Sequence, residues 1–133
     1  MTMAATMRIM NRTRGTVLGT DVVLADTWWG RLRGFLARPR PAQGEGILLS
    51  PCGAVHTFGM RFDLDVIFLD AAGDILALEE NMAPWRTSPR VAGSRYVLEV
   101  PAGTVQATGT AVGDTCAWTR VERPERPSLQ ETP

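Results

Sequence analysis

The sequence contains no lysine, one histidine, two cysteines and no apolar run long enough to cross a bilayer. Two cysteines are too few for a disulfide scaffold, so we expect reduced thiols. Arginines interrupt the N-terminal residues, which therefore lack the apolar core of a secretory signal. Together these absences predict a cytoplasmic protein that is not attached to a membrane.

The sequence also has no excess of positive or negative charge, because 14 basic residues balance 14 acidic ones. A net charge of zero gives no overall field to attract nucleic acid, and we expect no nucleic-acid partner. The chain has no phosphate-binding glycine loop and no Ser–His–Asp order, and we expect no cofactor. Monomer and homodimer both remain open as assembly states.

The length of 133 residues fits one domain with a core of its own. We predict this domain over residues 16–121. The preceding residues 1–15 are predicted to be a disordered leader. The proline-rich residues 122–133 show no apolar periodicity and are predicted to be a disordered tail.

Most of the predicted elements are short strands. Residues 16–24 are rich in β-branched side chains and contain the turn signal Gly19–Asp21, which predicts a hairpin with Gly19 at positive φ. The run 64–69 is almost entirely apolar, which predicts a central strand covered on both faces. Further strands are predicted at 47–49, 75–80, 95–100 and 115–121, with a short helical turn at 104–110.

One longer helix is predicted at about residues 26–37. Asp26 or Thr27 suits the N-cap position, and Pro39 ends the helix. Its apolar positions follow helical spacing: Trp28, Leu32, Phe35 and Leu36.

Two motifs resemble a known family. The stretch HTFGMRFDLDVIFLD at 56–70 and the stretch LEVPAG at 98–103 are similar to those of the domain of unknown function 192 family, also called uncharacterised protein family 0127. The similarity extends over roughly residues 16–119. It implies a mainly β fold with some α+β elements: a compact, jelly-roll-like β-sandwich with one prominent helix. It implies no established activity, substrate or cofactor.

The stretch 50–70 holds the side chains with most chemistry. Cys52, His56 and Met60 are spaced by four residues and are soft ligands that suit copper or zinc. However, four residues of strand cover about 13 Å, too far for one metal ion unless the chain bends. The alternative is that Cys52 is a small buried hydrophobe and Met60 fills the core.

His56 is also a candidate acid or base for a hydrolase-like enzyme. Such a histidine needs an orienting carboxylate, and Asp65 or Glu99 would supply it. Alternatively, Asp65 caps backbone N–H groups or pairs with Arg61. A third reading makes His56 a structural, hydrogen-bonded residue.

Glu99 lies in an apolar strand, where a carboxylate should be paired or face solvent. Its candidate partners are Arg86 and Arg90 on the long loop 81–94, and such a pair would either form part of a pocket or simply fix the loop. Trp85, on the same loop, could stack on a ligand, as could Trp28 or Trp29.

We therefore expect a binding module with a pocket near His56, closed by the loop 81–94, for a small polar ligand or a protein segment. A hydrolase-like enzyme and a copper- or zinc-handling protein are the alternatives. The residues predicted to bind the ligand are His56, Thr57, Met60, Arg61, Asp65, Arg86 and Glu99.

Overall fold

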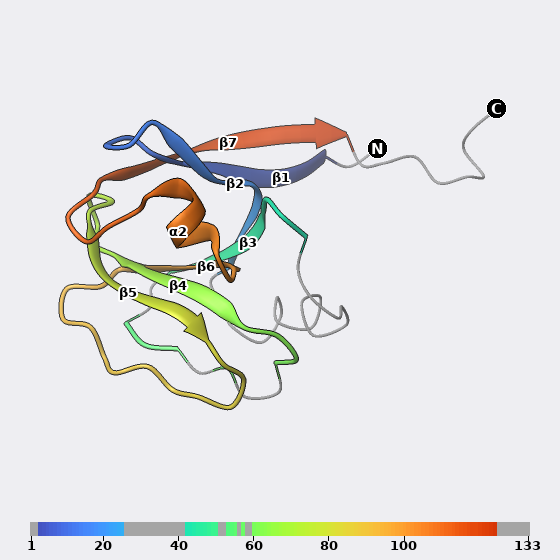
Figure 1. Ribbon diagram of the computed structural model, residues 1–133. Coiled ribbons are helices and arrows are strands. Elements are labelled where there is room, and N and C mark those ends of the chain that lie inside the picture. The colour runs from blue at the N-terminus through green and yellow to red at the C-terminus, as the bar shows by residue number, and fades with distance from the viewer. Residues whose placement is uncertain (1–2, 26–41, 51–52, 56, 58–59, 125–133) are drawn as a thin grey trace.

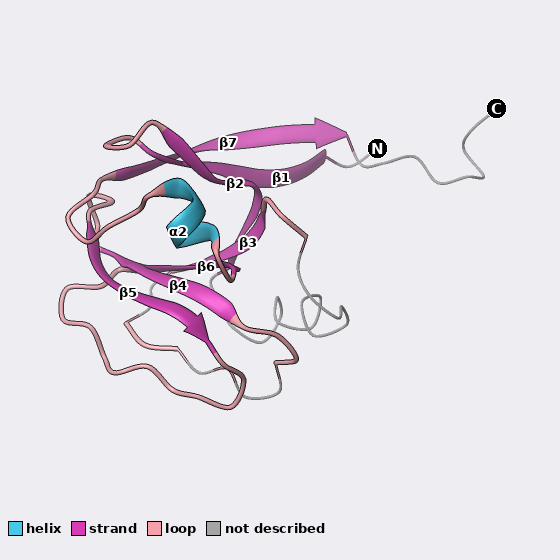
Figure 2. Ribbon diagram, viewed as in Figure 1, coloured by secondary structure: helices cyan, strands magenta, loops and turns pink. Residues whose placement is uncertain are grey.

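The computed structural model describes residues 3–25, 42–50, 53–55, 57 and 60–124. Seven strands form one sheet in the order β5-β4-β6-β3-β2-β1-β7 (Figure 1). Neighbouring strands are antiparallel except for the parallel pair β2 and β3 (Figure 2). The strands are β1 (Met3–Asn11), β2 (Thr16–Ala25), β3 (Glu45–Leu49), β4 (Leu64–Leu69), β5 (Ile75–Met82), β6 (Tyr96–Pro101) and β7 (Cys116–Pro124).

The two edge strands, β5 and β7, meet at one end because the sheet is curled. An isolated antiparallel bridge joins Asp74 to Thr115, just before the two strands begin. The Ile75 amide donates to the Asp114 carbonyl at 2.9 Å, and the Thr115 hydroxyl donates to the Asp74 carboxylate at 2.7 Å. The halves β7-β1-β2 and β6-β4-β5 therefore face each other as in an open sandwich (Figure 1). The predicted mainly β fold is confirmed.

An inner core fills the space between these two halves. The short helix α2 (Thr104–Thr108) packs into it through Val105. Burial of these apolar side chains, each worth about 1.5–3 kcal/mol, stabilises the curled sheet. The inner core consists of Ile9, Leu18, Val22, Leu48, Ile67, Leu69, Ile75, Leu98, Val100, Val105 and Cys116.

An outer core covers the opposite face of β3, β6 and β4. All six residues of β4 are buried because both faces of this strand are covered, as its apolar run predicted. The outer core consists of Ile47, Leu49, Val55, Met60, Phe62, Leu64, Val66, Phe68, Met82 and Val97.

A buried polar network fixes the end of β1 to the turn before β7. The Asn11 amide donates to the Asp114 carboxylate at 2.9 Å and to the Thr110 hydroxyl at 3.1 Å. Arg14 Nε donates to the same carboxylate at 2.9 Å. The hydrogen bonds from Arg14 and Asn11 lower the pKa of Asp114 to about 2.

Two predictions about the N-terminal part are wrong. Residues 3–11, predicted to belong to a disordered leader, form β1, which lies between β2 and β7. β1 has few β-branched residues, and its pairing with β7 along its whole length outweighs this weak propensity.

Residues 16–25 form one continuous strand rather than a hairpin. Gly19 is not at positive φ but marks an irregularity in the register with β1. A Cβ atom at Gly19 would lie 2.5 Å from Val22 Cγ2, so this position needs glycine for space rather than for a turn.

The predicted helix at 26–37 and the part of the predicted tail after residue 124 lie outside the described residues. β7 continues to Pro124, beyond the predicted end of the domain at residue 121. Within the described ranges, no helix has the length and apolarity needed to cross a membrane.

Candidate functional site

Two segments without regular secondary structure cover the outer core, and hydrogen bonds join them. The Ser88 amide donates to the Val55 carbonyl at 2.8 Å, and the Val91 amide donates to the Gly53 carbonyl at 2.9 Å. The Ser88 hydroxyl accepts a bond from the Val55 amide at 2.9 Å. The loop 81–94 is thereby fixed over the stretch in which the site was predicted.

Thr57 is fully buried and fixes the turn formed by residues 83–86 of this loop. Its amide donates to the Arg86 carbonyl at 2.8 Å, and its carbonyl accepts from the Trp85 amide at 3.0 Å. Its hydroxyl donates to the Ala83 carbonyl at 2.6 Å and accepts from the Arg86 amide at 2.8 Å. Thr57 therefore holds the turn through hydrogen bonds to Ala83, Trp85 and Arg86.

Trp85, within this turn, has a left-handed backbone conformation with a φ of 65°. For a bulky residue that conformation costs roughly 1–3 kcal/mol. Its side chain is 68% exposed, more than any other large hydrophobic side chain of the described residues. An exposed aromatic side chain on a strained backbone makes Trp85 a candidate for a functional role.

A hollow of about 270 Å³ opens beside the turn, and we call it the β5 hollow. One wall is the end of β5 and the other is the turn that Thr57 fixes. Its lining combines acidic and basic side chains, and it includes one predicted ligand residue, Arg86. The lining residues are Glu79, Glu80, Asn81, Met82, Ala83, Arg86 and Thr87.

Glu99 lies in β6 between Ile47 and Val66, on the outer face of the sheet. Its side chain is 1% exposed, and burial raises the pKa of this carboxyl group to about 7. In the part of the chain that is described, no ion pair joins it to Arg86 or Arg90. The predicted ion pair is therefore wrong, and Glu99 is a buried acid surrounded mainly by apolar side chains.

Asp65 lies on the inner face of β4, away from Thr57, Met60 and Glu99. Its carboxylate accepts three backbone N–H bonds: from Asn81 at 2.9 Å, Gly103 at 3.1 Å and Val105 at 2.9 Å. The predicted alternative, that Asp65 caps backbone N–H groups, is confirmed. The structure does not bring Asp65 together with the other described residues of the predicted site.

The other residues of the predicted site lie in the core, on the surface or outside the described residues. Met60 is buried in the outer core, and Arg61 is exposed. Cys116 is a buried free thiol, and burial is the main cause that raises its pKa to about 12. Cys52 and His56 lie outside the described residues. Among those described, no three His, Cys, Asp or Glu side chains form a group suited to a metal ion.

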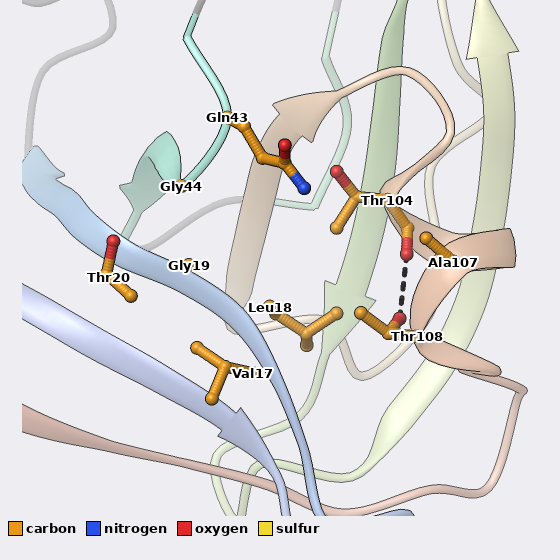
Figure 3. A pocket seen from close by; sticks show the side chains of 9 residues that line it. All are labelled: Val17, Leu18, Gly19, Thr20, Gln43, Gly44, Thr104, Ala107 and Thr108. Carbon is orange, nitrogen blue, oxygen red and sulfur yellow. Dashed lines mark hydrogen bonds between the residues drawn. The ribbon is translucent and has the colours of Figure 1, made fainter.

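A second hollow of about 270 Å³ lies between β2, the turn before β3 and α2. We call it the α2 hollow, and Figure 3 shows its lining. The Thr108 hydroxyl donates to the Thr104 carbonyl at 2.7 Å, so this hydroxyl is engaged within the helix. None of the described residues that line it is charged: Val17, Leu18, Gly19, Thr20, Gln43, Gly44, Thr104, Ala107 and Thr108.

Sequence reasoning did not assign Glu79, Glu80 or Asn81 to a site. Asn81 is the other described non-glycine residue at positive φ, with a φ of 53°, and it lies at a register irregularity between β5 and β4. Two acidic residues in a row near a strand end are common on solvated surfaces. Their closeness to Arg86 arises from the turn that Thr57 fixes, which no local pattern indicates.

The chain matches the model of the family described as "DUF192: Uncharacterized ACR" over residues 9–118. It belongs to this family. A DUF192 relative from Thermococcus sibiricus, a UPF0127 protein, is 30% identical over 114 residues, which cover 83% of this chain and 73% of the relative. Another, from Pyrococcus furiosus, is 30% identical over 119 residues, covering 85% and 99%.

Solved structures resemble this DUF192 domain as well. A protein of unknown function from Novosphingobium aromaticivorans aligns with a TM-score of 0.70 at 22% identity, covering 84% of this chain and 83% of that one. A Sinorhizobium meliloti protein, named a "putative transcription regulator", aligns with a TM-score of 0.67 at 25% identity, covering 88% and 94%. The first of these likenesses bears on the fold alone.

Proposed function

We propose that this DUF192 domain is a binding module for a small polar ligand or a protein segment, and that its site is the β5 hollow together with Trp85, which belongs to the turn that forms one wall of the hollow but is not itself a lining residue. The observation that carries the proposal is the conformation of Trp85. The residue is 68% exposed while its backbone is held at a φ of 65°. A residue that costs conformational free energy and exposes apolar surface suits contact with a ligand.

Several features support a preformed site. Thr57 fixes both the amide and the carbonyl of Arg86, so the start of that side chain has a defined position. β5 is paired with β4, which fixes the opposite wall. A site whose walls are ordered before binding loses less entropy when the ligand arrives.

Binding is proposed rather than catalysis because of the two carboxylates that were candidates to orient His56. Asp65 accepts three backbone N–H bonds on the inner face. Glu99 is 1% exposed. Neither carboxylate lines the β5 hollow, so neither can itself act as the acid or base on a ligand bound there.

The charge balance of this chain does not support the role in transcription for which the Sinorhizobium protein is named. Transcription regulators bind the DNA backbone through an excess of positive charge. This chain has equal numbers of basic and acidic residues.

The proposal is tested by titrating isotope-labelled protein with a library of small polar fragments and recording amide and indole NMR shifts. We expect the fragments that bind to shift resonances of residues 79–87, including the Trp85 indole N–H. Trp85→Ala should weaken these fragments at least about tenfold, a change of about 1.4 kcal/mol.

Val112→Ala is the matched control, because Val112 is 60% exposed but lies away from the β5 hollow. It should leave fragment binding unchanged. Shifts confined to the α2 hollow, or equal binding by Trp85→Ala and the wild type, would contradict the proposal.

A further inference from the structure

We propose that the ligand of the β5 hollow is a small zwitterion, with one ammonium and one carboxylate group as in an α-amino acid. This inference rests on the proposed binding function and adds the chemical class of the ligand. It is carried by the residues that line the hollow, which include the acidic residues Glu79 and Glu80 and the basic residue Arg86.

These opposite charges do not neutralise each other. Considering the described residues alone, no ion pair joins Arg86 to Glu79 or Glu80, although all three line the same hollow. Opposite charges around a small space attract a molecule that carries both signs. An ammonium group would bind the carboxylates, and a carboxylate would accept two parallel bonds from the guanidinium.

The positions of the charged groups are set by the fold. Glu79 pairs with Val66, which also pairs with Glu99, so Glu79 and Glu99 lie in one row across the outer face. Glu79 is only partly exposed, which strengthens its interaction with a cation relative to a fully solvated carboxylate. The backbone of Arg86 has a fixed position because Thr57 forms hydrogen bonds with both its amide and its carbonyl.

The size of the hollow limits the ligand. A volume of about 270 Å³ lies below the roughly 300–1,000 Å³ that is common for drug-sized ligands. The lining also includes the apolar residues Met82 and Ala83, which suit contact with a short alkyl group.

Ligands of a single charge fit less well. A simple anion would meet acidic residues as well as Arg86, and like charges repel it. A simple cation would leave the guanidinium without a partner. A molecule with both groups pairs with both walls, and its amino end faces the larger opposing charge.

The test uses L-alanine and two blocked forms of it, N-acetyl-L-alanine and L-alaninamide, titrated into the full-length protein at millimolar concentrations. NMR shifts at residues 79–87 give the affinity of each. We expect L-alanine to bind at least about tenfold more tightly than either blocked form, because each block removes one charge.

Two variants test which residue binds the carboxylate of L-alanine and which binds its ammonium group. Arg86→Gln should bind L-alanine no better than L-alaninamide, since the carboxylate has lost its partner. Glu79→Gln should narrow the preference of L-alanine over N-acetyl-L-alanine severalfold. Arg61→Gln is the matched control, because Arg61 is also an exposed arginine but does not line the hollow. It should behave as the wild type.

The inference is overturned if the blocked forms bind as well as L-alanine, or if L-alanine causes no shift at residues 79–87. Fragment binding that depends on Trp85 would then still support a binding module with a different ligand. If L-alanine causes no shift at residues 79–87 and fragment binding does not depend on Trp85, the proposed binding function is wrong as well.

Discussion

The carboxylate of Asp65 accepts a hydrogen bond from the backbone amide of Val105 at 2.9 Å. This bond joins the central strand β4 to the helix α2. The same carboxylate accepts the amides of Gly103 and Asn81, at 3.1 Å and 2.9 Å. One buried side chain thus satisfies three backbone donors from two separate segments. A charged acceptor makes such bonds stronger than neutral ones.

Replacing this carboxylate should destabilise the whole domain. Asp65→Asn removes the charge and one acceptor oxygen, and it places an amide NH₂ group against backbone donors. We expect the free energy of unfolding to fall by about 3 kcal/mol, because buried donors lose their partners. Urea unfolding at 25 °C measures the change.

Asp63→Asn is the matched control for this substitution, since Asp63 is exposed two residues earlier. An exposed substitution of this kind should change stability by no more than about 0.5 kcal/mol. Equal effects at the two positions would show that the three bonds do not stabilise the fold.

Removing the Thr57 hydroxyl should loosen the turn at residues 83–86. Thr57→Val keeps the shape of the side chain but leaves the Arg86 amide and the Ala83 carbonyl without this partner. The expected loss of stability is about 1–3 kcal/mol. Hydrogen exchange should become faster at the amides of Trp85 and Arg86.

Thr57→Ser retains the hydroxyl and should protect both amides nearly as well as the wild type. If exchange at Trp85 and Arg86 is as slow in Thr57→Val as in Thr57→Ser, the turn is fixed by other contacts.

The strain at Trp85 can be measured by comparing two variants that both lack the indole. A left-handed conformation costs an alanine roughly 1–2 kcal/mol, whereas glycine adopts it freely but loses more entropy on folding. We therefore expect Trp85→Gly to be more stable than Trp85→Ala by about 0.5–1 kcal/mol. Thermal or urea unfolding of the two variants measures the difference.

Val112 supplies the control, since it is exposed but not at positive φ. There the order should reverse, with Val112→Gly less stable than Val112→Ala. The same order at both positions would mean that Trp85 is not strained.

Glu99 should make stability depend on pH. Burial raises its folded pKa from 4.5 to about 7, so the folded protein retains a proton that the unfolded chain releases between those values. The free energy of unfolding is therefore highest below pH 4.5, the pKa of Glu99 in the unfolded chain. It falls as the pH rises toward 7 and then levels off. The loss amounts to about 3 kcal/mol.

Glu99→Gln removes this ionisation and should be more stable than the wild type at pH 8. Unfolding curves of both proteins between pH 4 and 8 test this, with Glu79→Gln as a control in the same cross-strand row. Parallel pH profiles for wild type and Glu99→Gln would show that Glu99 ionises freely in the folded state.

The strands of the central sheet could be predicted because burial leaves a clear pattern. The apolar run 64–69 became β4, and the run before Pro101 became β6. β1 could not be predicted in the same way. Its side chains show little preference for strands, and it is held by two neighbouring strands, one of them more than a hundred residues away in sequence.

The candidate site was predictable only in part. The long loop and Arg86 stood out as unusual features, and both lie at the β5 hollow. The position of Asp65 on the inner face follows from strand alternation once β4 is known, but its three partners are set by tertiary contacts. The left-handed turn at Trp85 has no sequence signal, since tryptophan rarely adopts it.

The meeting of β5 and β7 at Asp74 and Thr115 also bears on solubility. Strand edges with unpaired N–H and C=O groups are places where one molecule can add to another and begin an aggregate. Here the curl of the sheet pairs the two edges with each other at one end. Farther along, β7 carries Arg120 and ends at Pro124, which has no N–H to donate. At this end of the described sheet, the two edges are therefore less open to pairing with another molecule.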